Sequence, residues 1–442
     1  MSAGAAMAYP RRALRTTLAV PSVPSPAEIP AGRRIALLLT DLNGGGVQKM
    51  TLALAGALAA RGHHVEIVLY ERSGVLGVEI PPEVTVHHLQ ATASRFAGRL
   101  APIGADPLAF PRLLLPVLLP RKPLRGLKYL PALAEYLERQ RPDALISAAP
   151  NCNLAAVWAK RLARVPTRVL ISERTAPSEM LSKSKNWRAR FLPGLMQRTY
   201  QQADVIVAVS RALADNLAAV TGIPRTRIKA IYNPVVGPEI AEAAAVAPSH
   251  PWFGPDQPPV ILAVGRLSDQ KDYPTLIQAF AEVRRSRHVR LVIFGAASDA
   301  QKTAQRRGEL TALATELGVG EDVDVPGFTA NPYSYMARAA ALVLSSRYEG
   351  LPGVLIQAMA CGCPVVSTDC PSGPAEILEG GRYGPLVPIG DVPALAAALV
   401  QVLDTPLDAE TLKRRADDFS VDHAVDGYLD ALFRPNTAKV GA

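Results

Sequence analysis

Short apolar runs, each followed by a loop and then by apolar residues at helical spacing, recur along this chain. The first run spans residues 35–39, a glycine-rich loop follows it, and residues 47–58 carry apolar side chains at the helical period. The next run, residues 65–70, is typical of a strand buried on both faces of a parallel sheet. Further strands are predicted at residues 144–147, 168–171 and 205–209. Strands and helices in alternation predict an α/β fold with a doubly wound sheet.

A proline-rich segment, residues 233–259, interrupts this alternation with seven prolines. The pattern then begins again, with strands predicted at residues 260–264, 289–294 and 341–344. Because 442 residues exceed what one hydrophobic core usually serves, we predict two Rossmann-like domains, at 33–232 and 260–418, joined by a linker at 233–259. Such sheets bind ligands at the carboxyl ends of their strands, so the ligand is expected in a cleft between the domains.

The two ends of the chain are assigned separately. Residues 1–32 are rich in Ala, Pro, Ser and Arg, and their short apolar stretch is broken by Pro21, so we predict a flexible basic arm rather than a secretory signal. Residues 419–442 hold one more predicted helix. No run reaches the roughly 18 uncharged apolar residues of a membrane-spanning helix, so we expect a chain that does not cross a membrane.

The composition limits the classes of ligand that the protein is expected to bind. A net charge of +9 favours anionic ligands, among them nucleic acid, anionic lipid and diphosphates. Aromatic residues make up only 5% and no basic stripe interleaves with them, which argues against nucleic acid. Four scattered cysteines and no histidine cluster at metal-ligand spacing predict a cytoplasmic protein with reduced thiols and without a metal.

The most informative stretch is residues 346–366. A predicted strand ends before a loop that carries Glu349, and Pro352 starts a helix at its first position. The free backbone amides of Gly353 and Val354, together with the positive end of the helix dipole, would form a cradle for a diphosphate beneath Glu349.

A second loop, residues 265–272, follows the first strand of the second domain. Arg266 and Lys271 lie five residues apart in it, so both cations can converge on one phosphate group at the edge of the sheet where ligands bind. The alternative is a solvated charged loop without a ligand.

These segments resemble the family-4 retaining glycosyltransferases of GT-B fold, from about residue 33 to about residue 433. The resemblance implies that Arg266 and Lys271 hold the diphosphate of a nucleotide sugar and that Glu349 lies by the donor sugar. In the E-x7-E element of the family a second glutamate binds the ribose, and Gln357 stands at that position here. An amide lacks the charge assistance of a carboxylate, so we expect weaker ribose binding.

The same resemblance implies the reaction. A hexose or N-acetylhexosamine would pass from a nucleotide diphosphate sugar, with UDP as our first choice, to an acceptor. We take the acceptor to be a glycan or lipid-linked molecule of the cell envelope, because of the two basic and apolar segments described below. Transfer would retain the anomeric configuration and need neither metal nor other cofactor. The first domain would bind the acceptor, the second the donor, and the last helix would cross back to the first domain. Hydrolysis is disfavoured, because one carboxylate and one amide at 349 and 357 do not supply the two acids of a glycosidase.

Candidates in the first domain are less specific. Gly44, Gly45 and Gly46 lack side chains, so their amides can approach a phosphate or sugar closely. Many relatives carry a histidine in the loop that corresponds to residues 171–178, and none is present here. Glu173 and Arg174 are the candidates for a polar role there, the alternative being a surface loop closed by a local ion pair.

Two basic and apolar segments, residues 110–137 and 183–198, predict docking on an anionic membrane face, with ordinary core helices as the alternative. Two other functions stay open. A nucleotide-sugar-binding protein without transferase activity would explain Gln357 and the missing histidine, and an epimerase or phosphorylase would share the fold.

Overall fold

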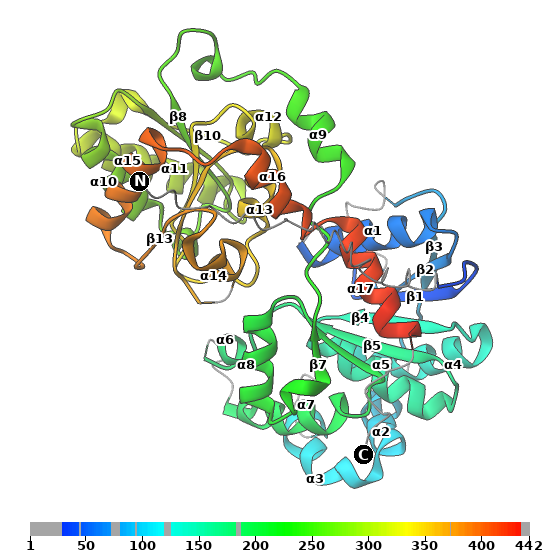
Figure 1. Cartoon of the computed structure of the whole chain (residues 1–442). Helices are drawn as coiled ribbons and strands as arrows, with labels where there is room; N and C mark the ends of the chain where they lie inside the picture. The colour runs from blue at the N-terminus through cyan, green and yellow to red at the C-terminus, as the bar shows by residue number, and fades with distance from the viewer. Residues whose placement is uncertain are drawn as a thin grey trace, which may run out of the picture.

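Two parallel sheets organise the protein (Figure 1). The computed structural model describes residues 29–43, 46–71, 80–92, 95–118, 125–182, 187–371 and 373–434. The N-terminal domain has a seven-stranded sheet in the order β3-β2-β1-β4-β5-β6-β7, and the C-terminal domain has a six-stranded sheet in the order β10-β9-β8-β11-β12-β13. In both sheets the strand order reverses beside the first strand of the domain, which confirms the predicted doubly wound α/β architecture.

The strands of the N-terminal sheet are β1 (Arg34–Leu39), β2 (His64–Leu69), β3 (Thr85–His88), β4 (Ala144–Ala148), β5 (Arg168–Glu173), β6 (Val205–Ala208) and β7 (Ile228–Ala230). Those of the C-terminal sheet are β8 (Val260–Val264), β9 (Arg290–Phe294), β10 (Val323–Gly327), β11 (Ala341–Leu344), β12 (Val365–Thr368) and β13 (Leu386–Val387). The central strands are almost wholly buried, as their apolar sequences predict. The edge strands β3, β7, β10 and β13 are partly exposed and have no long apolar run, so the sequence pattern missed them.

Helices cover both faces of each sheet (Figure 1). In the N-terminal domain they are α1 (Gly46–Ala60), α2 (Arg95–Ala105), α3 (Phe110–Leu113), α4 (Leu130–Gln140), α5 (Pro150–Ala163), α6 (Pro177–Ser182), α7 (Leu192–Tyr200) and α8 (Arg211–Thr221). In the C-terminal domain they are α10 (Tyr273–Arg284), α11 (Ala300–Glu316), α12 (Tyr333–Met336), α13 (Gly353–Ala360), α14 (Pro374–Ile377), α15 (Val392–Asp404) and α16 (Ala409–Asp417). The sequence predicted Pro352 as the first residue of α13. In the structure Pro352 precedes the helix, which begins at Gly353.

The chain passes between the domains twice, and the two passages run side by side. The linker meets the segment that precedes α17 (Val421–Phe433), where the amides of Val235 and Val236 both donate to the carbonyl of Phe419, at 3.0 and 3.1 Å. The amide of Val421 donates in return to the carbonyl of Val236, at 2.9 Å. The proline-rich linker also contains a helix, α9 (Pro238–Ala245), which the lack of a sustained apolar period had hidden.

Helix α17 packs along α1 of the N-terminal domain (Figure 1). Val425, Tyr428 and Leu432 are buried in the same apolar cluster as Leu54 and Leu58 of α1. The last helix of the chain therefore belongs to the core of the first domain, although it follows the second domain in sequence.

A polar contact ties the domains together on the other side of the cleft. Glu376, in α14, accepts hydrogen bonds from the backbone amides of Arg211 and Ala212 at the start of α8, at 2.8 and 3.1 Å. The hydroxyl of Tyr232 donates to the same carboxylate at 2.7 Å. A carboxylate at a helix N-terminus is favoured by the free amides and the helix dipole, so this contact stabilises the observed arrangement of the domains.

Replacement of Glu376 by Ala is expected to lower the free energy of unfolding by about 2 kcal/mol, because three hydrogen bonds to one charged group are lost. Urea denaturation measures the change. Glu410→Ala is the matched control, since Glu410 is exposed and its side chain pairs, among the described residues, with Lys413 of the same helix, α16. Equal stabilities of the two variants would contradict the assignment of Glu376 as a link between the domains.

Candidate functional site

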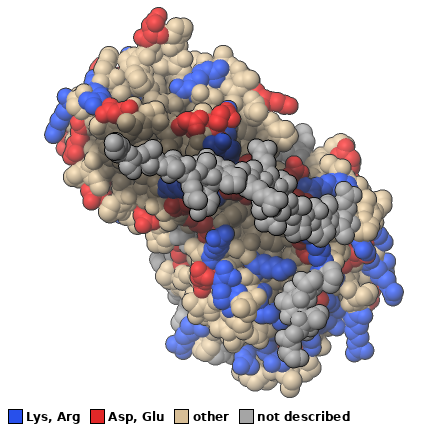
Figure 2. Space-filling model, viewed as in Figure 1, with Lys and Arg blue, Asp and Glu red and all other residues tan. Residues whose placement is uncertain are grey.

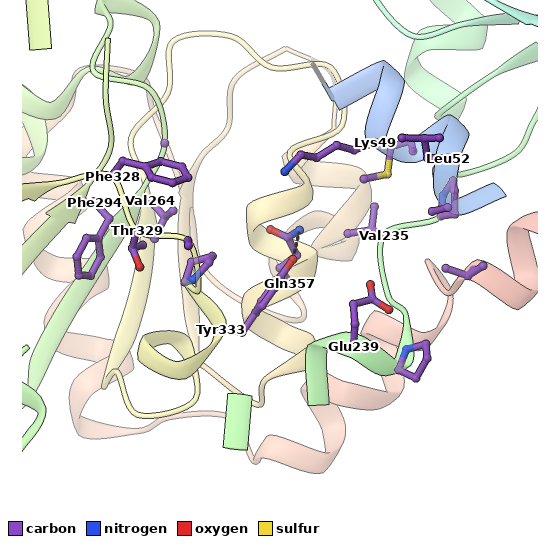
Figure 3. Close-up of a pocket in the computed structure, with 18 of the residues that line it drawn as sticks. Lys49, Leu52, Val235, Glu239, Val264, Phe294, Phe328, Thr329, Tyr333 and Gln357 are labelled. Carbon is purple, nitrogen blue, oxygen red and sulfur yellow. Dashed lines mark hydrogen bonds between the residues drawn. The ribbon is translucent and has the colours of Figure 1, made fainter. Parts of the chain in front are cut away.

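A cavity of 1040 Å³ opens between the domains (Figure 3). Its wall on the N-terminal side is the face of α1 that carries Lys49, Leu52 and Ala53. The opposite wall comes from the carboxyl ends of β8, β9 and β10 and from α12 and α13 of the C-terminal domain. The cavity therefore lies where two doubly wound sheets are expected to bind a ligand.

Two loops of the C-terminal domain meet beside this cavity, because β8 and β11 are neighbours in the sheet. The loop after β8 holds residues 265–272, and the loop after β11 holds residues 345–352. The hydroxyl of Ser345 donates to the carbonyl of Lys271 at 2.7 Å, and the amide of Arg347 donates to the carbonyl of Gln270 at 2.8 Å. The side-chain amide of Gln270 donates to the carbonyl of Tyr348 at 2.9 Å. These bonds fix one loop against the other.

Lys271 and Glu349 form an ion pair at this junction. The Lys271 Nζ atom lies 2.7 Å from Glu349 Oε1, and the two side chains are only 13% and 11% exposed. The hydroxyl of Ser346 donates to the same Oε1 atom at 2.7 Å. The structure thus brings together two residues that the sequence analysis had taken from separate loops.

Arg266 lines the cavity and is exposed. Its Nη2 atom lies 3.3 Å from the side-chain oxygen of Gln270. The carbonyl of Gly265 would clash, at 1.9 Å, with any side chain at Gly295, so only a glycine after β9 lets the two strand ends approach so closely. Arg266 and Lys271 both lie in the loop at this edge of the sheet. Of the two, Arg266 lines the cavity.

Gln357 faces the cavity from the second turn of α13 (Figure 3). Its Nε2 atom donates to the hydroxyl of Tyr333 at 3.2 Å, which orients the amide. Tyr333 also lines the cavity, and the sequence analysis did not name it. The only signal for it is an aromatic residue shortly after β10, at the ligand-binding edge of the sheet.

The first residues of α13 are Gly353 and Val354, both half-buried. Gly353 lies beside Val235 of the linker, whose nearest methyl group would be 3.7 Å from a side chain at this position. Neither residue lines the cavity, so the start of α13 borders it at the linker rather than forming its wall.

The glycine loop is only partly described. Gly44 and Gly45 lie outside the described residues, and Gly46 is the first residue of α1. Before the loop, Asp41 accepts a hydrogen bond from the amide of Asn43 at 3.0 Å and one from the side chain of Gln48 at 3.3 Å.

Glu173 is placed differently from the expectation. It is the last residue of β5, not part of a loop, and is 1% exposed. Its Oε1 atom accepts hydrogen bonds from Asn153, at 2.9 Å, and from the hydroxyl of Tyr200. The carboxylate points into the domain, because β5 continues for two residues beyond its predicted end, and neither an ion pair with Arg174 nor a contact with the cavity is formed.

Arg174 follows β5 at the cleft. Its carbonyl lies against Gly350 of the opposite domain, 3.3 Å from where a side chain at Gly350 would begin. The Nε and Nη1 atoms of Arg174 are buried and have no hydrogen-bond partner among the described residues.

Comparison with known proteins identifies the family. A model of the glycosyl transferase 4-like domain matches residues 45–234, and a model of glycosyl transferases group 1 matches residues 258–405. Together these matches include every strand of both sheets except β1, and both loops of the site. The chain belongs to the group 1 glycosyltransferases.

Three relatives illustrate the similarity of this glycosyltransferase to others. The N-acetylgalactosamine-N,N'-diacetylbacillosaminyl-diphospho-undecaprenol 4-alpha-N-acetylgalactosaminyltransferase of Campylobacter jejuni is 27% identical over 392 residues, which are 86% of this chain and 92% of the relative. The structure of the lipopolysaccharide outer core galactosyltransferase WaaB has a TM-score of 0.64 and 20% identity, over 90% of this chain and 99% of that one. Anabaena HepE in complex with UDP has a TM-score of 0.65 and 20% identity, over 90% and 99%. Their fold is the GT-B fold that the sequence predicts.

Two further properties of the glycosyltransferase come from the described residues. Among them, no three side chains of the types His, Cys, Asp and Glu gather as the ligands of a metal ion would. None of the described helices is by itself long and apolar enough to cross a membrane, and one sharply bent pair, α15 with α16, reaches that length and composition only when joined.

Buried Glu173 makes the stability of the glycosyltransferase depend on pH. Burial raises the pKa of Glu173 to about 7, although the hydrogen bonds from Tyr200 and Asn153 act in the opposite direction. A carboxyl with a raised pKa stabilises the fold fully below its unfolded pKa and loses this contribution as pH rises through the folded pKa.

Relative to Glu173→Gln, the free energy of unfolding of the wild type is therefore expected to fall by about 2 kcal/mol between pH 5 and pH 8, at about 1.4 kcal/mol per unit of pKa shift. Urea denaturation of both proteins at the two pH values measures this difference. A difference that does not change with pH would show that Glu173 stays charged in the folded protein.

Proposed function

We propose that this glycosyltransferase transfers a hexose or N-acetylhexosamine from a nucleotide diphosphate sugar, with UDP as the favoured nucleotide, to a glycan or lipid-linked acceptor of the cell envelope. Transfer proceeds with retention and without a metal. The observation that carries the proposal is the cavity between the domains, with Arg266 and Gln357 in its wall and the pair Lys271–Glu349 at its border.

The reaction needs charge stabilisation at the leaving group. As the glycosidic bond stretches, negative charge grows on the diphosphate, and Arg266 and Lys271 are the cations at this edge of the sheet. Lys271 first has to turn from Glu349 to the phosphate. Glu349 then faces the sugar hydroxyls and the positive charge that develops on the sugar ring.

We place the base of the nucleoside beside Phe328. Phe328, after β10, is 79% exposed and lines the cavity, so its ring offers a stacking surface to a base. Gln357, which Tyr333 orients, lies in the same domain. Its side-chain oxygen would accept a hydrogen bond from a ribose hydroxyl. The UDP complex of HepE, a protein of the same fold, supports UDP as the first nucleotide to test.

The names of relatives support the acceptor class. The Campylobacter relative acts on a diphospho-undecaprenol-linked saccharide, and WaaB is a lipopolysaccharide galactosyltransferase. We assign Arg174 to the acceptor side, because its backbone follows β5 and lies against Gly350 of the opposite domain.

Titration of the purified protein with UDP, GDP and ADP in the absence of metal tests the donor site, and release of nucleotide from the corresponding sugar donors tests transfer. Micromolar binding of one nucleotide is expected. Replacement of Arg266 by Ala should lower turnover on the order of 10² to 10³, by analogy with the loss of one donor at a developing negative charge. Arg139→Ala is the control, since Arg139 is an exposed arginine that pairs with Glu135 in α4 of the N-terminal domain, outside the central cavity.

Wild-type turnover in Arg266→Ala would refute the assignment of Arg266 to the donor diphosphate. Binding of a nucleotide without turnover on any sugar donor and acceptor would favour the alternative of a nucleotide-sugar-binding protein, in which the neutral Gln357 marks a weakened donor site.

We also propose that the N-terminal domain docks on an anionic membrane face. Leu100, Leu108, Phe110 and Leu114 are exposed by 55, 77, 46 and 37%, and all lie between α2 and the turn that follows α3. The exposed Arg112 lies among them.

The two basic and apolar segments noted in the sequence lie near each other. Residues 114–118 contact residues 187–191, and α3 contacts α7. In Figure 1, α2 and α3 form the end of the N-terminal domain away from the C-terminal domain, and Figure 2 shows many Lys and Arg side chains over this domain. Apolar side chains surrounded by cations are suited to the interface of an anionic bilayer.

Replacement of both Leu108 and Phe110 by Ala is expected to weaken binding to vesicles of phosphatidylglycerol and phosphatidylcholine in equal parts about tenfold at low salt, because two inserting side chains are truncated. Co-sedimentation measures binding. Leu317→Ala with Ile389→Ala is the matched control, since these residues are exposed by 38 and 42% in the C-terminal domain. A wild-type protein that stays in solution would contradict membrane docking.

A further inference from the structure

The hydroxyl group of Tyr273 is buried without a hydrogen bond beside the catalytic ion pair. Tyr273 is the first residue of α10 and is 4% exposed. Its Oη atom has no partner among the described residues. A buried hydroxyl without a partner destabilises a fold by about 1 to 3 kcal/mol, so such groups call for an explanation.

The backbone turn at Asp272 determines the position of the Tyr273 hydroxyl. Asp272, between the loop and the helix, has a φ of 48° in the left-handed region and is held by Arg347 at 3.0 Å. The turn directs the ring of Tyr273 beneath the end of β8. A side chain added at Gly265 would meet Tyr273 Oη at 3.0 Å and Lys271 Cε at 2.9 Å, so both side chains crowd the same position.

The third member of the group is Glu349. The pKa of Tyr273 is raised first by burial and then by the negative charge of Glu349, so the hydroxyl stays protonated near that carboxylate. Both donors of Glu349, Lys271 and Ser346, bind its Oε1 atom. Its Oε2 atom has no hydrogen bond among the described residues.

We propose that Tyr273 is a positioning residue, whose hydroxyl donates a hydrogen bond to Glu349 once Lys271 turns from this carboxylate to the diphosphate of the donor. The inference rests on the proposed function, because it requires a diphosphate at the end of β8. It gives the buried hydroxyl, which is unpaired in the ligand-free protein, a hydrogen-bond partner in the donor complex.

The hydrogen bond from Tyr273 would offset part of the free energy that is lost when the Lys271–Glu349 pair breaks. When Lys271 leaves, Glu349 loses a charged partner at a position where the side chain is 11% exposed. A carboxylate in such surroundings needs a replacement donor, and a protonated tyrosine hydroxyl supplies one without adding a net charge. The carboxylate then keeps its place by the donor sugar.

A double-mutant cycle of Tyr273→Phe and Glu349→Ala, with UDP binding as the readout, tests this role. Tyr273→Phe is expected to weaken UDP binding about tenfold in the wild-type background, in line with one hydrogen bond to a charged group. In the Glu349→Ala background the same change should have no effect, because the acceptor of the hydroxyl is gone.

Thermal unfolding separates positioning from a structural role. Tyr273→Phe removes an unpartnered hydroxyl, so its melting temperature should equal or exceed that of the wild type. The control is Tyr335→Phe, because Tyr335 is 6% exposed in the same domain and its hydroxyl lies 3.1 Å from Ser249. This control should lose thermal stability and bind UDP like the wild type.

Unchanged UDP binding in Tyr273→Phe, or an equal loss with and without Glu349, would overturn the positioning role while the proposed function stands. A wild-type protein that binds none of UDP, GDP and ADP would overturn both.

Discussion

The hydrogen-bonded contact between the loops after β8 and β11 is the interaction on which the rest of the site depends. Parallel strands that are neighbours in a sheet end at the same edge, so their loops have to share that space. Here the carbonyls of Gln270 and Lys271 accept from the opposite loop, and the backbone of one loop becomes the support of the other. Arg266, Lys271 and Glu349 acquire fixed starting positions because their loops cannot move independently.

The contact between the two loops also brings Lys271 and Glu349 together as an ion pair. In the ligand-free protein each of the two buried charges has a partner, which avoids the desolvation penalty of a lone buried ion. In the proposed function, a diphosphate that binds Lys271 has to compensate for the broken ion pair, which would favour ligands with enough negative charge. In the proposed positioning role, the hydroxyl of Tyr273, which has no partner among the described residues, would limit this penalty.

The domains are joined by contacts at both borders of the cleft. On one side the linker and the segment before α17 exchange backbone hydrogen bonds, and α17 buries its apolar face against α1. On the other side Glu376 caps α8 of the opposite domain. The continuous backbone connection can act as a hinge, whereas the side-chain contact of Glu376 can break and form again.

The sequence by itself determined the two doubly wound domains, because each central strand is buried on both faces and has to be continuously apolar. It also determined which loops carry the cations and the carboxylate, since these loops directly follow predicted strands. It missed the edge strands β3, β7, β10 and β13, which have no long apolar run, and it assigned Glu173 to a loop. Only the tertiary structure decided that Glu173 points into the core, that Lys271 binds Glu349, and that Tyr273 lies beside them. These contacts join segments far apart in the chain, and their geometry follows from strand order and packing, which no local pattern encodes.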